Sequence, residues 1–156
     1  MKCKNGAPPI VRLALAREKC PRHAVAEKVR TPTDIVNFVQ KQYGCQAQEY
    51  FVALGISPAS EPLGILEVAV GGLDQTAVDP RVLFSGLLLM GATSAVLCHN
   101  HPSADTSPSQ ADVTLTRQLA QSAKLLGIRL LDHIIVGPGA KWSSMLALGL
   151  MQEGAQ

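Results

Sequence analysis

The spacing of hydrophobic and polar residues predicts helices and strands in alternation along the chain. Residues 31–44 begin with Thr-Pro-Thr-Asp, carry apolar side chains every three or four positions and end at a glycine, which is typical of a capped helix. Residues 49–54 and 65–70 are rich in aliphatic, aromatic and β-branched side chains, and the turn sequence Ser-Pro-Ala-Ser lies between them. We expect these two segments to pair as antiparallel strands.

The second half of the chain predicts further helices and strands. Asp79-Pro80 is a helix start, with an aspartate N-cap and a proline in the first turn, and residues 93–98 are a short buried strand. Residues 108–126 have the apolar spacing of a long helix. Residues 130–136 predict another buried strand, and residues 142–150 a final short segment. The expected fold class is therefore α/β, with a mixed central sheet and flanking helices.

The composition predicts one compact domain, because 47% of the 156 residues are hydrophobic and only 17% are charged. We place this domain at residues 31–150, between an arm of residues 1–30 and a tail of residues 151–156. The four cysteines form no Cys-x-x-Cys pair and no signal sequence precedes them, which favours a reducing, cytoplasmic setting. Glycine, threonine and serine interrupt the apolar run of residues 82–98, so we expect a buried helix and strand there rather than a membrane span.

Positive charge is concentrated at the N-terminus. Residues 1–30 hold eight lysines and arginines against two glutamates, a formal charge of +6, whereas the rest of the chain carries −4. A basic arm of this kind can contact nucleic acid by neutralising phosphates. The arm has no aromatic residue for base stacking, so a solvated tail is the other interpretation.

One apolar stretch ends abruptly in imidazoles, hydroxyls and carboxylates. Strand side chains alternate between faces, so His99 and His101 point the same way. Ser107-Pro108 predicts the N-cap and first residue of the next helix, on which Ser109 and Asp112 would share a face. Two imidazoles and a carboxylate suit Zn²⁺ in a catalytic site, because three protein ligands leave a fourth position for water. A His-x-His pair alone is more often a surface pair, but the added serine and aspartate favour the metal site.

The spacing of these residues resembles the JAMM motif of the MPN/JAB metalloprotease superfamily, which is His-x-His, seven residues and Ser-x-x-Asp. The flanking His-Asn-His-Pro-Ser and the later Leu-Asp-His-Ile-Ile-Val-Gly resemble its RadC branch more narrowly, over about residues 31–150. The resemblance implies an MPN/JAB (cytidine deaminase-like) architecture and zinc held by His99, His101 and Asp112. It also implies that Ser109 hydrogen-bonds the bound water or stabilises an oxyanion, and that an upstream glutamate is the general base.

The motif does not fix which glutamate is the base. Glu49 opens the first predicted strand, and the family has its base at the beginning of an early strand, so Glu49 is our predicted base. Glu67 is the alternative, because it lies in the second predicted strand in an alternating register. For either residue, the remaining interpretation is a solvated strand glutamate.

Three residues near the motif carry separate expectations. Ala104 stands where RadC-like sequences usually have glycine, which predicts a slightly different loop shape. Cys98 faces away from the histidines by alternation, so we expect a small buried hydrophobe. His133 is expected to be structural or to support a ligand from behind.

Two classes of function remain open. The first is a zinc-dependent hydrolase, a JAMM-type metallopeptidase or isopeptidase that cleaves a protein or peptide with metal-activated water, Glu49 and Ser109. The second is a non-catalytic DNA-repair or DNA-processing module that contacts nucleic acid through its basic arm. The chain keeps every position of the motif, which favours the hydrolase.

Overall fold

The chain folds into a single sheet flanked by helices, as seen in a computed structural model that describes residues 31–71 and 78–151. The predicted basic arm lies outside these residues, as does most of the predicted tail. Among the residues described, no helix has both the length and the apolar character needed to cross a membrane. The elements in chain order are α1 (Pro32–Tyr43), β1 (Tyr50–Ile56), β2 (Pro62–Val70), α2 (Pro80–Met90), β3 (Ser94–Asn100), α3 (Gln110–Leu125), β4 (Arg129–Val136) and β5 (Trp142–Ser144).

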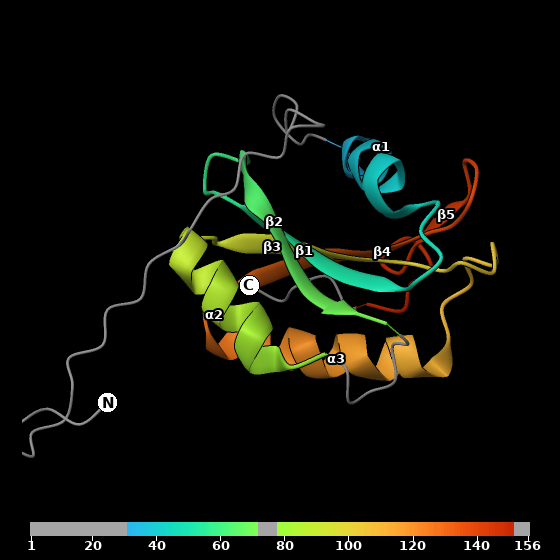
Figure 1. Cartoon of the computed structure of the whole chain (residues 1–156). Coiled ribbons are helices and arrows are strands. Elements are labelled where there is room, and N and C mark those ends of the chain that lie inside the picture. The colour runs from blue at the N-terminus through green and yellow to red at the C-terminus, as the bar shows by residue number, and fades with distance from the viewer. Residues whose placement is uncertain (1–30, 72–77, 152–156) are drawn as a thin grey trace, which may run out of the picture.

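The sheet is mixed, with the strand order β2-β1-β3-β4-β5. β1 pairs antiparallel with both β2 and β3, β3 pairs parallel with β4, and β4 pairs antiparallel with β5. Helix α1 covers one face of the sheet, and α2 and α3 cover the other (Figure 1). The predicted fold class and the predicted hairpin of β1 and β2 are therefore confirmed.

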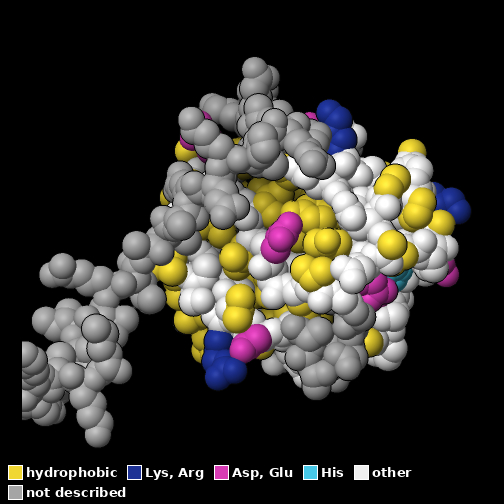
Figure 2. All heavy atoms as spheres, in the orientation of Figure 1, with side chains coloured by type: hydrophobic (Ala, Val, Ile, Leu, Met, Phe, Trp, Pro, Cys, Tyr) yellow, Lys and Arg dark blue, Asp and Glu magenta, His cyan; other side chains and the backbone are white. Residues whose placement is uncertain are grey.

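Each face of the sheet has its own hydrophobic core, because strand side chains alternate. On the α2 and α3 face, Phe51 and Leu97 pack with Leu119 of α3, and all three side chains are completely buried. On the α1 face, Val52 and Cys98 pack with residues of α1, so Cys98 is the buried hydrophobe that was predicted. The edge strand β2 is only partly covered, and Figure 2 shows hydrophobic side chains gathered over this part of the surface.

Helix α3 begins two residues later than its sequence pattern predicted. Its N-cap is Ser109 rather than Ser107, and its first residue is Gln110 rather than Pro108. The Ser109 side chain accepts from the Asp112 N–H at 3.1 Å, and the Asp112 carboxylate accepts from the Ser109 N–H at 2.8 Å. This reciprocal pair satisfies two backbone donors and makes Ser109 the N-cap. The prediction of Ser107 as the cap was therefore wrong.

The loop between β3 and α3 contains a left-handed residue. Ala104 has a φ of 63°, and its N–H donates to the His101 carbonyl at 3.2 Å. Glycine adopts this conformation without strain, whereas alanine adopts it at a cost in free energy. The predicted difference in loop shape stays a prediction. Gly137 packs closely on the same loop, since a Cβ atom there would lie 3.0 Å from Cγ2 of Thr106.

The left-handed conformation of Ala104 predicts that Ala104→Gly stabilises the protein. Relief of backbone strain exceeds the added entropy of the unfolded chain, so we expect the free energy of unfolding to rise by about 0.5–1 kcal/mol. Ala120→Gly in the regular helix α3 is the control and should lower it by about 1 kcal/mol. Urea denaturation measures both variants, and a loss of stability in Ala104→Gly would contradict the strain.

Candidate metal centre

His99 is buried near the end of β3, on the sheet face covered by α3, with 1% of its surface exposed. Its ring is stacked with that of Phe51 on β1, with 6.2 Å between the centroids. Burial lowers the pKa of His99 from its ordinary value of 6.5 to about 4, although the Asp112 carboxylate acts in the opposite direction. The ring is therefore neutral near pH 7, which is the form that binds metal ions.

His101 follows directly after β3 and is fixed by two hydrogen bonds. Its backbone N–H donates to the Val136 carbonyl of β4 at 2.8 Å, and its ring Nδ1 lies 2.6 Å from the carbonyl oxygen of Asp105. Because a carbonyl oxygen only accepts, Nδ1 of His101 carries a proton and donates it. The other ring nitrogen, Nε2, faces Nε2 of His99 at 2.9 Å.

Asp112 reaches the two histidines from the first turn of α3. Its Oδ1 atom lies 3.4 Å from Nε2 of His99, and its Oδ2 atom lies 3.7 Å from Nε2 of His101. The Ser109 hydroxyl donates to Oδ2 of Asp112 at 2.6 Å and accepts from the Asp112 N–H. Ser109 therefore orients the carboxylate, and its hydroxyl proton points at Asp112 rather than into open space.

These three side chains form a donor set that can bind a metal ion. One ligand atom from each of His99, His101 and Asp112 lies within 4.8 Å of the others. The Nε2 atoms of the two histidines are 2.9 Å apart, and each lies 3.4–3.7 Å from one of the two Asp112 carboxylate oxygens, Oδ1 for His99 and Oδ2 for His101. Ligand atoms around a tetrahedral zinc ion are separated by about 3.3 Å. Two imidazole nitrogens and a carboxylate that converge in this way offer a cation three ligand atoms.

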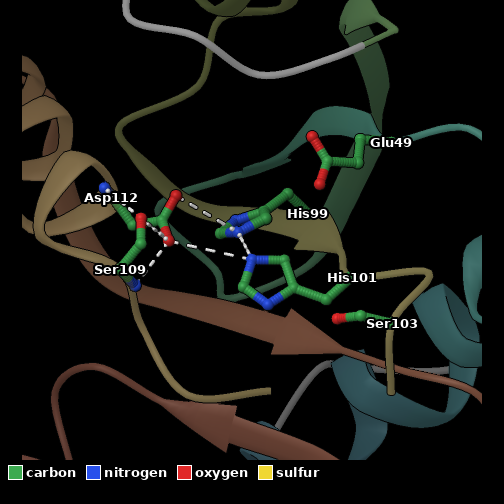
Figure 3. Close-up of a pocket in the computed structure, with 6 residues that line it drawn as sticks. All are labelled: Glu49, His99, His101, Ser103, Ser109 and Asp112. Carbon is green, nitrogen blue, oxygen red and sulfur yellow. Dashed lines mark hydrogen bonds and ion pairs between the residues drawn. The ribbon is translucent and has the colours of Figure 1, made fainter. Parts of the chain in front are cut away.

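Glu49 lies on the same side of the sheet as these donors. It immediately precedes β1, and it lines a cavity of about 250 Å³ together with His99, His101 and Asp112. Ser103 and Ser109 complete the lining of this cavity. In Figure 3, Glu49 stands on the opposite side of His99 from Asp112. The structure thus brings all five predicted site residues together.

Asn100 fixes the backbone around Glu49 and was not identified from the sequence. Its side chain is fully buried, with Oδ1 accepting from the Tyr50 N–H at 2.7 Å and Nδ2 donating to the Gln48 carbonyl at 2.9 Å. These two backbone groups flank Glu49 on either side. Strand alternation turns the Asn100 side chain away from the cavity, so it was not expected to be a site residue. The one sequence signal that could have identified it was its position between His99 and His101.

Glu67, the alternative base, is held elsewhere. It lies on β2 opposite Val52, and its carboxylate accepts a hydrogen bond from the Tyr43 hydroxyl of α1 at 2.8 Å. It is exposed and does not line the cavity. The two glutamates therefore differ in position, because only Glu49 lies beside the histidines.

His133 supports the donor set from behind, as predicted. It is completely buried on β4, and its Nε2 atom lies 2.8 Å from Nδ1 of His99. Burial lowers its pKa well below the ordinary value, and the neighbouring histidines lower it further. The adjacent Asp132 does not contact the His133 ring: its carboxylate accepts from the His133 backbone N–H at 2.7 Å, the Ser144 hydroxyl at 2.6 Å and the Leu146 N–H at 3.0 Å.

Comparison with known proteins agrees with this geometry. Residues 29–150 match the family described as the RadC-like JAB domain. A UPF0758 protein of Halalkalibacterium halodurans is 41% identical over 109 residues, covering 70% of this chain and 47% of the relative. A UPF0758 protein of Geobacter sulfurreducens is 33% identical over 126 residues, covering 81% of this chain and 55% of the relative.

A UPF0758 protein of Methanosarcina mazei is 37% identical over 112 residues, covering 72% of this chain and 49% of the relative. The chain spans about half the length of the curated relatives it matches. The matched segment contains His99 of β3, His101 directly after it, the α3 cap and His133 of β4. On this evidence, the chain belongs to the RadC-like JAB domain family.

Proposed function

We propose that the chain is a zinc-dependent hydrolase that cleaves amide bonds in proteins or peptides, as a metallopeptidase or an isopeptidase. The observation that carries this proposal is the cavity of about 250 Å³ that Glu49 shares with the donor set of His99, His101 and Asp112. Three donors with a separate carboxylate beside them suit catalysis, because a structural zinc site has four protein ligands and no neighbouring base.

Zinc fits the donors better than magnesium or calcium, because imidazole nitrogen is a ligand for the first and oxygen for the others. His99 and His101 would hold the ion through Nε2, and Asp112 through its carboxylate. When bound, zinc would polarise the substrate carbonyl and lower the pKa of water towards about 7.

Glu49 would be the general base. It accepts a proton from the attacking water as the oxygen forms its bond to the carbonyl carbon, and it returns the proton to the amine nitrogen as the carbon–nitrogen bond breaks. Asn100 keeps this carboxylate in place through the backbone on both sides of it. Ser109 holds the Asp112 carboxylate in orientation, and contact with an oxyanion would require its hydroxyl to turn away from Asp112.

The alternative function, a DNA-binding module, rests on the basic arm of residues 1–30, which lies outside the described residues. Nothing within the described residues favours it over the hydrolase. This alternative would be supported if the purified chain were retained on DNA at low salt and released at higher salt.

The donor set predicts that the purified protein holds about one zinc ion per chain. His101→Ala removes one of three ligands, and we expect it to lose the metal on dialysis because two donors bind zinc weakly. Glu67→Gln is the control and should keep the ion, since Glu67 is bonded to Tyr43 away from the site. Elemental analysis by mass spectrometry measures the content. A His101→Ala protein with stoichiometric zinc would refute the ligand assignment.

The position of Glu49 predicts that Glu49→Gln lowers the rate of hydrolysis by about 10²–10⁴-fold while zinc content is unchanged. The amide keeps the size of the side chain but cannot accept the proton. Glu67→Gln is again the matched control and should keep wild-type activity. A library of quenched fluorescent peptides and isopeptides provides the assay. Loss of activity in Glu67→Gln but not in Glu49→Gln would transfer the role to Glu67.

A further inference from the structure

We propose that Thr116 and His133 form a buried hydrogen-bond relay that places the ring proton of His99 on Nδ1 and so leaves its Nε2 lone pair directed at the metal site. Both are positioning residues, and the proposal deepens the metal site of the proposed function, on which it rests. The relay begins at the backbone carbonyl of Asp112 and ends at His99, so it also joins two of the three metal ligands.

The first link is the Thr116 hydroxyl, whose oxygen lies 2.6 Å from the Asp112 carbonyl oxygen and 2.6 Å from Nδ1 of His133. The hydroxyl has one proton, and the carbonyl can only accept. If the proton went to His133, two oxygens would face each other at 2.6 Å with no proton between them. The hydroxyl therefore donates to Asp112 and accepts from Nδ1–H of His133.

The second link follows from the first. A neutral His133 carries one ring proton, and Thr116 places it on Nδ1, so its Nε2 atom has a free lone pair. This Nε2 atom lies 2.8 Å from Nδ1 of His99, which must then donate. Because His99 is also neutral, its own Nε2 has no proton and faces Asp112 and His101.

Burial makes this arrangement the favoured one. Thr116 and His99 are 1% exposed and His133 is completely buried, so water cannot replace a missing partner. The opposite arrangement of protons would leave the Thr116 and Asp112 oxygens in contact at 2.6 Å with no proton between them, and it would put a proton on the Nε2 atom of His99 that faces the metal site. Phe51 packs against both rings, edge-on to His133 at 5.4 Å and stacked with His99 at 6.2 Å, which keeps the rings from turning over.

His101 shows why His99 needs a relay. The Asp105 carbonyl accepts a hydrogen bond directly from Nδ1 of His101. Because a carbonyl can only accept, this contact alone fixes the tautomer of His101. The partner of His99 is another histidine, whose nitrogens can donate or accept. Only the hydroxyl and carbonyl behind His133 remove this ambiguity.

The test compares Thr116→Val with Thr116→Ser. Valine removes the hydroxyl while keeping the shape, so the rings are no longer held to one tautomer and zinc affinity should fall about 10–100-fold. Serine keeps the hydroxyl and should restore affinity. Thr114→Val is the matched control, because Thr114 lies on the same helix and donates to the Gln110 carbonyl at 2.9 Å but does not touch a histidine. Competition with a chromophoric chelator measures affinity, and thermal unfolding of the metal-free proteins checks that each variant folds.

Nitrogen-15 NMR of the histidine rings in the metal-free protein reads the tautomers directly. We expect the proton on Nδ1 of both His99 and His133 in the wild type and in Thr116→Ser, with Nε2–H of His99 becoming populated in Thr116→Val. A wild-type His99 with its proton on Nε2, or Thr116→Val that folds and binds zinc as tightly as Thr116→Ser, would overturn the relay. Because this readout needs neither zinc nor substrate, a wild type with the expected tautomers that binds no zinc would refute the proposed function and leave the relay standing.

Discussion

The pairing of β3 between β1 and β4 is the constraint on which the rest of the site depends. In this register His99 lies opposite Phe51 on one side and Ile135 on the other. The same pairing places Glu49, just before β1, and His133, on β4, on the face that carries His99. Since strand side chains alternate, a slip of one residue in β3 would turn the histidines towards α1 and bring Cys98 to the cavity. The buried cores on both faces of the sheet oppose such a slip.

At the N-terminus of α3, the same side chains stabilise the helix and form part of the candidate site. Ser109 and Asp112 form a capping box, which stabilises the helix by satisfying two backbone donors. The same contacts aim the Asp112 carboxylate at the two histidines, so the cap that starts the helix also supplies one of the three candidate metal donors. Negative charge is favoured at this end of a helix, and this partly offsets the cost of burying the carboxylate. In the proposed zinc-bound state the cation would offset the remainder, and metal binding would then be coupled to stability.

The sequence predicted the elements and site residues that depend on local patterns, and it missed the contacts between residues that are distant along the chain. Strand alternation and the motif spacing predicted the donor set, and the β-hairpin and the starts of α1 and α2 were also predicted. The start of α3 was not, because Ser107-Pro108 and Ser109 with Asp112 are both acceptable starts, and only the reciprocal hydrogen bonds decide between them. Strand β3 runs to Asn100, beyond the predicted end at residue 98, because pairing with β1 and β4 continues there. The contacts of Asn100 with the chain around Glu49 join segments some 50 residues apart, and no local pattern contains them.

The most direct test of this account is X-ray absorption spectroscopy of the zinc-loaded protein. The account predicts nitrogen and oxygen neighbours at about 2.0–2.1 Å, outer-shell scattering from two imidazoles, and one position open to exchange with an added anion. Sulfur at about 2.3 Å, or a fourth protein ligand that no anion displaces, would contradict the central claim that His99, His101 and Asp112 form an open catalytic zinc site.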